Sequence, residues 1–117
     1  MDEEYLEAVL DLVALIPSAR AMTYGAIAEV VGDQLAATGS GRRGGPRQVG
    51  QVLARAGGGV PWWRVVAADG RPPAHHAHAA RDRWSAEGTA MTADGLRVRL
   101  PVAIWFPDAD SPGHVWP

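Results

Sequence analysis

The sequence predicts one mainly α-helical domain with a short β segment. Apolar residues recur at helical spacing near the N-terminus, and good helix-starting residues stand at Thr23 and Pro46. The pair Val65-Val66 favours a strand, and Asp69-Gly70 directly after it is a strong hairpin signal. A length of 117 residues suits a single domain with a modest core.

The first predicted helix spans residues 2–16. Asp2 is a suitable N-cap and Pro17 ends the helical pattern. The apolar positions follow the i, i+3, i+4, i+7 rule. They are Leu6, Val9, Leu10, Val13 and Ile16. We therefore assign this helix to the core and give it no functional role.

The second predicted helix begins after the N-cap Thr23 and ends at Gly32, which is a typical C-terminal stop. Residues 33–45 are rich in glycine and lack an apolar period, so they predict a flexible loop. Its Arg42 and Arg43 are expected to be solvated; a phosphate clamp is the alternative.

The third predicted helix begins at Pro46, a residue that suits the first helical position. Its apolar side comprises Val49, Val52, Leu53 and Ala56, and its other side comprises Arg47, Gly50, Gln51 and Ala54. A glycine inside a helix costs about 1 kcal/mol relative to alanine. Gly50 therefore indicates that something large approaches this face, either DNA or a closely packed helix.

The stretch 59–70 contains two adjacent tryptophans, Trp62 and Trp63, directly after Pro61. In an extended segment, successive side chains point to opposite faces. The two indoles are then not expected to share one core, and one of them should face a groove or pocket.

The C-terminal third carries further signals. Residues 77–87 predict a helix, and residues 96–100 alternate as a strand does. Three histidines, His75, His76 and His78, raise the question of a metal site. We predict no metal, because no cysteine or well-spaced carboxylate completes a tetrahedral ligand set. Trp105 and Trp116 are expected to cover the core, and residues 108–117 to form a tail.

Charge and composition narrow the function classes. The chain has no cysteine, which excludes disulfides, thiolate metal sites and thiol nucleophiles. No apolar run approaches the roughly 20 residues of a membrane span, and no signal peptide is visible, so we expect a cytoplasmic protein. Net charge is −2, yet residues 35–83 carry eight arginines against two aspartates. Such a basic block is expected where phosphates are bound.

Three motifs carry a family resemblance: Thr23-Tyr24-Gly25, Arg47-x-Val49-Gly50 and Pro61-Trp62-Trp63-Arg64-Val65. In this order they resemble the O6-alkylguanine-DNA alkyltransferases, whose active-site motif is Pro-Cys-His-Arg-Val. Tryptophan at the cysteine position is the mark of the alkyltransferase-like proteins, which bind alkylated guanine without repairing it. The resemblance implies a winged helix-turn-helix domain with a short β wing.

The resemblance also implies a mechanism, which is base flipping without chemistry. Arg47 would fill the gap left by the flipped base from the minor groove, while Tyr24 would press on the DNA backbone. Trp62, at the acceptor position, is expected to face the lesion pocket. The implied DNA-binding residues are Tyr24, Arg47, Gln48, Gly50, Gln51 and Arg64. The implied pocket residues are Pro61, Trp62, Trp63, Val65, Ala68 and Arg71.

The chain departs from the family pattern at three places. Trp63 replaces the usual histidine, so Glu87 is expected to lose its partner in the family's relay and to act as a structural hydrogen-bonding residue. Gly57 or Ala56 replaces an asparagine hinge. The loop that closes the pocket, which here carries the histidines, is several residues shorter than usual.

The implied partners are duplex DNA containing O6-alkylguanine and the proteins of nucleotide excision repair, with no cofactor. We expect a monomer, associated with the nucleoid if the source is bacterial. Two alternatives remain open. One is a winged-helix regulator that reads the major groove, and the other is a protein-binding adapter that uses the tryptophan pair as its interface.

Overall fold

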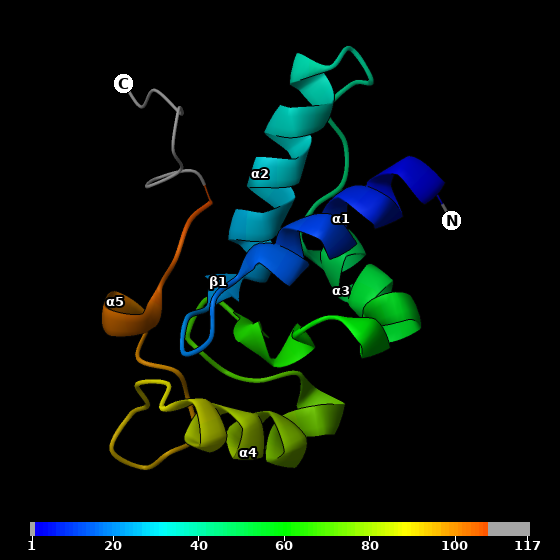
Figure 1. The fold of residues 1–117 in the computed structure, drawn as a ribbon. Coiled ribbons are helices and arrows are strands. Elements are labelled where there is room, and N and C mark those ends of the chain that lie inside the picture. Colours follow the sequence, from blue (N-terminus) through cyan, green and yellow to red (C-terminus); the bar gives the residue numbers. More distant parts are fainter. Residues whose placement is uncertain (1, 108–117) are drawn as a thin grey trace.

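The structure is a computed structural model that describes residues 2–107. It is mainly helical (Figure 1). The α-helices are α1 (Glu3–Leu15), α2 (Tyr24–Ala37), α3 (Pro46–Ala56), α4 (Ala77–Glu87) and α5 (Leu100–Ala103). Three 3₁₀ turns, η1 (Gly57–Gly59), η2 (Trp62–Arg64) and η3 (Ala74–His76), and two strands, β1 (Met22–Thr23) and β2 (Val65–Val66), complete the described elements. The predicted fold class, mainly helical with a short β segment, is confirmed.

The predicted helix starts are confirmed by their caps. An oxygen of Asp2 accepts a hydrogen bond from the backbone N–H of Tyr5 at 3.1 Å. The Thr23 hydroxyl accepts one from Ala26 N at 3.0 Å. Pro46 is the first residue of α3, and the side chain of Gln48 accepts the N–H of Gly45 at 2.9 Å. These contacts satisfy amide groups that have no partner inside a helix.

Helices α1, α2 and α3 enclose the larger core (Figure 1). Its fully buried side chains include Val9, Val13, Ile27, Val31, Val49 and Val52. A smaller cluster lies between α4, α5 and β2, and it contains Ala21, Val66, Ala80, Trp84, Val98 and Ala103. The connection from α3 to α4 runs between these two clusters and carries the tryptophan pair.

The two strands form a parallel pair, with Met22 opposite Val65 and Thr23 opposite Val66. The predicted hairpin is therefore wrong, although a turn does form at Asp69-Gly70, where Gly70 N donates to Ala67 O at 2.9 Å. Gly70 has a φ of 88°, and a Cβ there would lie 2.3 Å from the carbonyl oxygen of Val98. Pairing with β1 buries both Val65 and Val66 completely, which a solvent-facing hairpin would not do.

Two other boundaries differ from the prediction. Helix α2 continues through Gly32 to Ala37, so the loop spans residues 38–45 rather than 33–45. Gly32 is buried beside Arg42 and does not end the helix. Residues 96–100 form only one antiparallel bridge, Met91 with Val98, because the chain turns into α5 at Leu100.

Trp105 is partly buried against the larger core, as predicted. Trp116 and the tail 108–117 lie outside the described residues. Among residues 2–107, no helix is long and apolar enough to cross a membrane.

Candidate nucleic-acid interface

Helix α3 presents two different faces. Val49 and Val52 are completely buried against α1 and α2, whereas Arg47, Gln51 and Ala54 are exposed. Arg47 is the second residue of α3 and takes part in none of the ion pairs formed within residues 2–107. Its guanidinium is thus available for an external partner.

Gly50 lies in the middle of this exposed face. A Cβ added at Gly50 would meet one atom within 4 Å, Cε1 of Tyr24 at 4.0 Å. That distance is an ordinary van der Waals contact, so no neighbouring element requires glycine here. Within residues 2–107, close packing of another helix is therefore not the reason for Gly50, and the approach of an external molecule stays a prediction.

Tyr24 begins α2 and is half-buried beside this face. Burial raises the pKa of its hydroxyl, which keeps the side chain neutral near physiological pH. Tyr24, Gly50 and Trp62 line one cavity of about 400 Å³, within the range of roughly 300–1,000 Å³ that is typical of small-molecule sites. Its other lining residues are Leu53, Ala54, Gly57, Gly58, Pro73, Ala74, His75 and His76.

The sequence predicted an extended tryptophan pair. In the structure the pair instead forms the 3₁₀ turn η2. Both indoles are half-buried and pack against the same small cluster, with ring centroids 5.8 Å apart and planes at 87°. The expectation that they cannot share a core is therefore wrong, because a 3₁₀ turn does not alternate its side chains. Trp62 lines the cavity, whereas Trp63 is not among its lining residues.

Trp63 points instead to Glu87 at the end of α4. Its indole Nε1 donates a hydrogen bond to Oε2 of Glu87 at 2.9 Å. The backbone oxygen of Trp63 accepts a hydrogen bond from Nε1 of Trp84 at 2.7 Å. The guanidinium of Arg83 lies over the Trp63 ring at 4.5 Å, a cation–π distance. Three contacts with α4 therefore hold Trp63 in place.

Glu87 also binds Arg64 and the backbone of Ala19. Arg64 Nε donates to Glu87 Oε1 at 3.1 Å, and Ala19 N donates to the same oxygen at 3.1 Å. Ala19 has a φ of 68°, an unfavourable value for a residue with a side chain, and this hydrogen bond helps to hold it there. Burial alone would raise the pKa of Glu87, but the hydrogen bonds from Arg64, Ala19 and Trp63 outweigh burial and lower it.

These contacts confirm one expectation and change another. Glu87 is a structural hydrogen-bonding residue, as predicted, and the Trp63 indole is one of its donors. Arg64, assigned above to DNA binding, has a side chain only 17% exposed, and its Nη1 donates to Ile16 O at 2.8 Å. Its guanidinium is engaged inside the protein and does not belong to the exposed face.

The structure brings together only part of the expected pocket. Pro61 is half-buried at the start of η2, while Val65 is completely buried in the larger core. Ala68 is exposed after β2. Arg71 pairs with Asp69 at 3.1 Å and borders a separate depression with Arg81 and Arg97.

Two of the predicted DNA-binding residues, Gln48 and Gln51, line another depression, of about 420 Å³. The side chain of Gln48 also caps α3.

Two cavity residues, Leu53 and Pro73, were not assigned to the pocket from the sequence, whereas His75 and His76 lie in the loop that was expected to close it. The ring centroid of His76 lies 5.6 Å from that of Trp62, at an interplanar angle of 58°. His78 points elsewhere and its Nε2 lies 3.4 Å from Asp82. The pair Pro72-Pro73, which directly precedes η3, was the available signal, because proline restricts the backbone where the chain enters this turn. Within residues 2–107, no group of three potential ligands could hold a metal ion.

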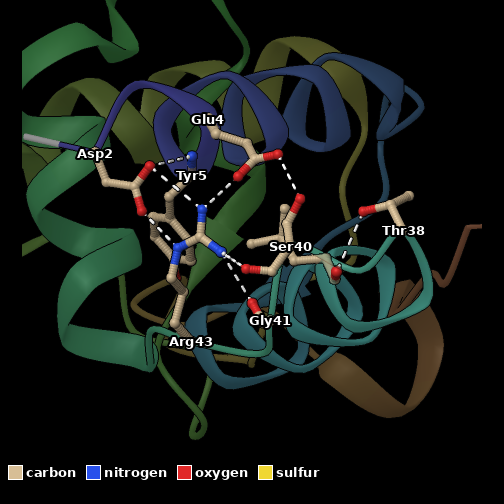
Figure 2. Close-up of polar contacts among 8 residues, drawn as sticks. Asp2, Glu4, Tyr5, Thr38, Ser40, Gly41 and Arg43 are labelled. Carbon is tan, nitrogen blue, oxygen red and sulfur yellow. Dashed lines mark hydrogen bonds and ion pairs between the residues drawn. The ribbon is translucent and has the colours of Figure 1, made fainter.

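Arg43 in the loop 38–45 is held by the N-terminus of α1 (Figure 2). Its Nη2 lies 2.6 Å from Glu4 Oε1, its Nε pairs with Asp2, and its Nη1 donates to Ser40 O at 2.8 Å. The hydrogen bond from Arg43 lowers the pKa of Asp2. Arg42 pairs with Asp33. Both arginines are thus partnered within the protein, which disfavours the phosphate-clamp alternative.

Comparisons with known proteins fit this geometry. The family described as 6-O-methylguanine DNA methyltransferase, DNA binding domain, matches residues 4–89. Among solved structures, S. pombe Atl1 in complex with damaged DNA containing O6-carboxymethylguanine is 33% identical, with a TM-score of 0.67 over 92% of this chain and 98% of that one. The S. pombe ATL in complex with DNA is 32% identical, with a TM-score of 0.66 and the same coverage. No curated protein sequence matches the chain.

Proposed function

The chain belongs to the family of the DNA-binding domain of 6-O-methylguanine DNA methyltransferase, as an alkyltransferase-like member, and we propose that it is a non-catalytic sensor of O6-alkylguanine in DNA. The observation that carries this proposal is the position of Trp62. Trp62 occupies the family's acceptor position and lines the cavity between α2, α3 and η3. With no cysteine in the sequence, an alkylated base in this cavity would meet an indole and no thiolate.

The exposed face of α3 supports minor-groove binding. Arg47 is free of internal ion pairs within the described residues, and Gly50 leaves room for a groove wall to approach. In the proposed complex, Arg47 takes the place of the extruded nucleotide and Tyr24 presses on the adjacent phosphate. Extrusion costs a few kcal/mol, and less for a damaged base that pairs badly.

The cavity then holds the flipped base against Trp62. Stacking of a base on an aromatic side chain contributes about 1–3 kcal/mol. Because no bond is formed, the complex persists for as long as these contacts last. S. pombe Atl1, the relative described above, is bound to DNA that contains O6-carboxymethylguanine, which supports a lesion-bearing duplex as the partner.

We further propose that the long-lived complex marks the lesion for nucleotide excision repair, and that the protein acts as a monomer in the cytoplasm or nucleoid. The adapter alternative needs an exposed tryptophan pair, and both indoles are half-buried against α4. The regulator alternative does not require Tyr24 and Trp62 to lie beside the groove-facing helix, so it leaves their position there unexplained.

The test is a comparison of two labelled duplexes that differ by a single O6-methylguanine, by fluorescence anisotropy at fixed salt. Salt is fixed because phosphate contacts make affinity depend on ionic strength. We expect tighter binding to the modified duplex, and mass spectrometry of the recovered DNA should find the methyl group in place.

Variants identify the residues responsible. Arg47→Ala and Trp62→Ala should each lose at least about tenfold in affinity for the modified duplex, corresponding to about 1.4 kcal/mol. Arg99→Ala removes an equal charge from an exposed position that does not line the cavity, and it should keep the preference. Equal binding of both duplexes by the unchanged protein would overturn the proposal.

A further inference from the structure

The cavity that Trp62 lines has only a few kinds of ionisable side chain. Its lining includes His75, His76 and Tyr24, but no aspartate, glutamate, lysine or arginine. The lining residues that can carry a positive charge are therefore the two histidines, whereas burial raises the pKa of Tyr24 and keeps its hydroxyl neutral.

Both histidines belong to η3, which begins directly after Pro73 and lies against the tryptophan. His76 is tilted over Trp62 at a centroid distance of 5.6 Å, and both imidazoles are exposed to solvent. Because both line the cavity, their imidazoles can reach a group held against the Trp62 ring.

The remaining walls are uncharged. Helix α3 and η1 contribute Gly50, Leu53, Ala54, Gly57 and Gly58 to the cavity. The charged groups that flank η3 in the sequence are paired with each other, Arg71 with Asp69 and His78 with Asp82. A charge that develops on His75 or His76 thus has no carboxylate partner among the cavity's lining residues.

We propose that His75 and His76 make this cavity selective for O6-substituents that carry a carboxylate, and that the selectivity increases as the pH falls from 8 to 6. An imidazolium donates from both ring nitrogens, and a charge-assisted hydrogen bond to a carboxylate is stronger than one between neutral groups. An uncharged substituent gains nothing from the added proton. This inference rests on the proposed function, because it requires the alkylated base to enter the cavity.

The experiment uses the full chain and four labelled duplexes of one sequence. The central guanine is unmodified, O6-methylated, O6-carboxymethylated or O6-carbamoylmethylated. The last two substituents have nearly the same shape and differ in charge. The quantity measured is the ratio of the Kd for the carbamoylmethyl duplex to the Kd for the carboxymethyl duplex, at pH 6 and pH 8 with ionic strength held constant. Attraction of protonated histidines to phosphates affects both duplexes equally and cancels in this ratio.

We expect the ratio to increase about three- to fivefold between pH 8 and pH 6, the size of a solvent-exposed ion pair. The increase should disappear when His75→Gln and His76→Gln are combined. It should persist in His78→Gln, which removes a neighbouring histidine that lies outside the cavity. Unchanged binding of the unmodified duplex at pH 8 shows that the variants are folded.

A ratio that is the same at both pH values, or an increase that survives the double substitution, would overturn the inference. If the O6-methyl duplex is still preferred over the unmodified one, the proposed function stands and only the histidine selectivity fails. If no modified duplex is preferred at either pH, both fail together.

Discussion

The indole Nε1 of Trp63 lies 2.9 Å from Oε2 of Glu87 and donates a hydrogen bond to it. In the alkyltransferases that the sequence resembles, a histidine stands at this position. The indole keeps an N–H donor for the glutamate but cannot accept or carry a proton as imidazole can. The contact therefore holds η2 against α4 without providing a proton relay, and of the two tryptophans only Trp62 lines the cavity.

A double-mutant cycle should show that Trp63 and Glu87 are coupled. Glu87→Gln removes the charged partner of Arg64 at a site where both side chains are largely buried, and should cost about 2–3 kcal/mol of unfolding free energy. Trp63→Phe loses the hydrogen bond and some buried area, at about 1–2 kcal/mol. The double variant, measured by urea unfolding, should lose about 1 kcal/mol less than the sum. Because glutamine keeps an acceptor oxygen, strict additivity would mean that the charge of Glu87 does not strengthen the hydrogen bond from Trp63.

Glu87 should also make stability depend on acid pH. Its pKa is lowered in the folded protein from the ordinary value of 4.5, so its contribution is complete above that pH and is lost as the pH falls through the folded value. The difference in unfolding free energy between the unchanged protein and Glu87→Gln should therefore be constant from pH 7 to pH 5 and shrink below pH 4.5. Other carboxylates, such as Asp2 and Glu4, are present in both proteins and cancel. A difference that grows on acidification would contradict this assignment.

The buried Tyr5 makes Gly44 the most constrained glycine of the loop 38–45. Gly44 has a φ of 84°, and a Cβ there would lie 2.3 Å from the Tyr5 hydroxyl. Gly41 has a φ of 87° with nothing within 4 Å, and so serves as the matched control. Gly41→Ala should cost about 1 kcal/mol from backbone strain alone. Gly44→Ala should cost about 2 kcal/mol more, because Tyr5 must move out of its packed position. Equal losses in urea unfolding would show that the ring moves freely.

Local signals in the sequence predicted local structure well. Asp2, Thr23 and Pro46 each begin a helix where expected, because a cap acts on amides within three residues of itself. Helix α4 has the predicted bounds, 77–87. The motifs that carry the family resemblance also predicted the fold class.

Contacts between distant segments could not be predicted in the same way. Val65 and Val66 pair in parallel with β1, more than forty residues earlier, instead of with the residues after Asp69-Gly70. The extended geometry expected for Trp62 and Trp63 failed because Glu87 and Trp84, on α4, hold η2. Arg64 looked like a DNA-binding residue because its motif lies beside the pocket, and only the position of Glu87 shows that it is internal.

Arg43 should contribute to the stability of the loop and not to phosphate binding. Its guanidinium is engaged by Asp2, Glu4 and two backbone oxygens of the loop (Figure 2). Arg43→Gln should therefore lower the melting temperature, while the slope of log Kd against log salt concentration for duplex DNA stays unchanged. Loss of one phosphate contact would reduce that slope by roughly 0.9. A reduction of that size would mean that Arg43 leaves the acidic pair when DNA binds.

Gly50 allows stability and DNA binding to be separated in one substitution. Gly50→Ala should raise the unfolding free energy by about 0.5–1 kcal/mol, because alanine favours a helix interior and the added Cβ has room, with Tyr24 at 4.0 Å. The same methyl group would stand on the face of α3 that we assign to the minor groove, and would hold the groove wall away from Arg47. We expect the affinity for the O6-methylguanine duplex to fall about tenfold in anisotropy, and the affinity for unmodified duplex to fall with it. A more stable protein with weaker binding cannot be explained by misfolding. Unchanged affinity would mean that DNA does not approach α3 at Gly50, and the exposed face would need another partner.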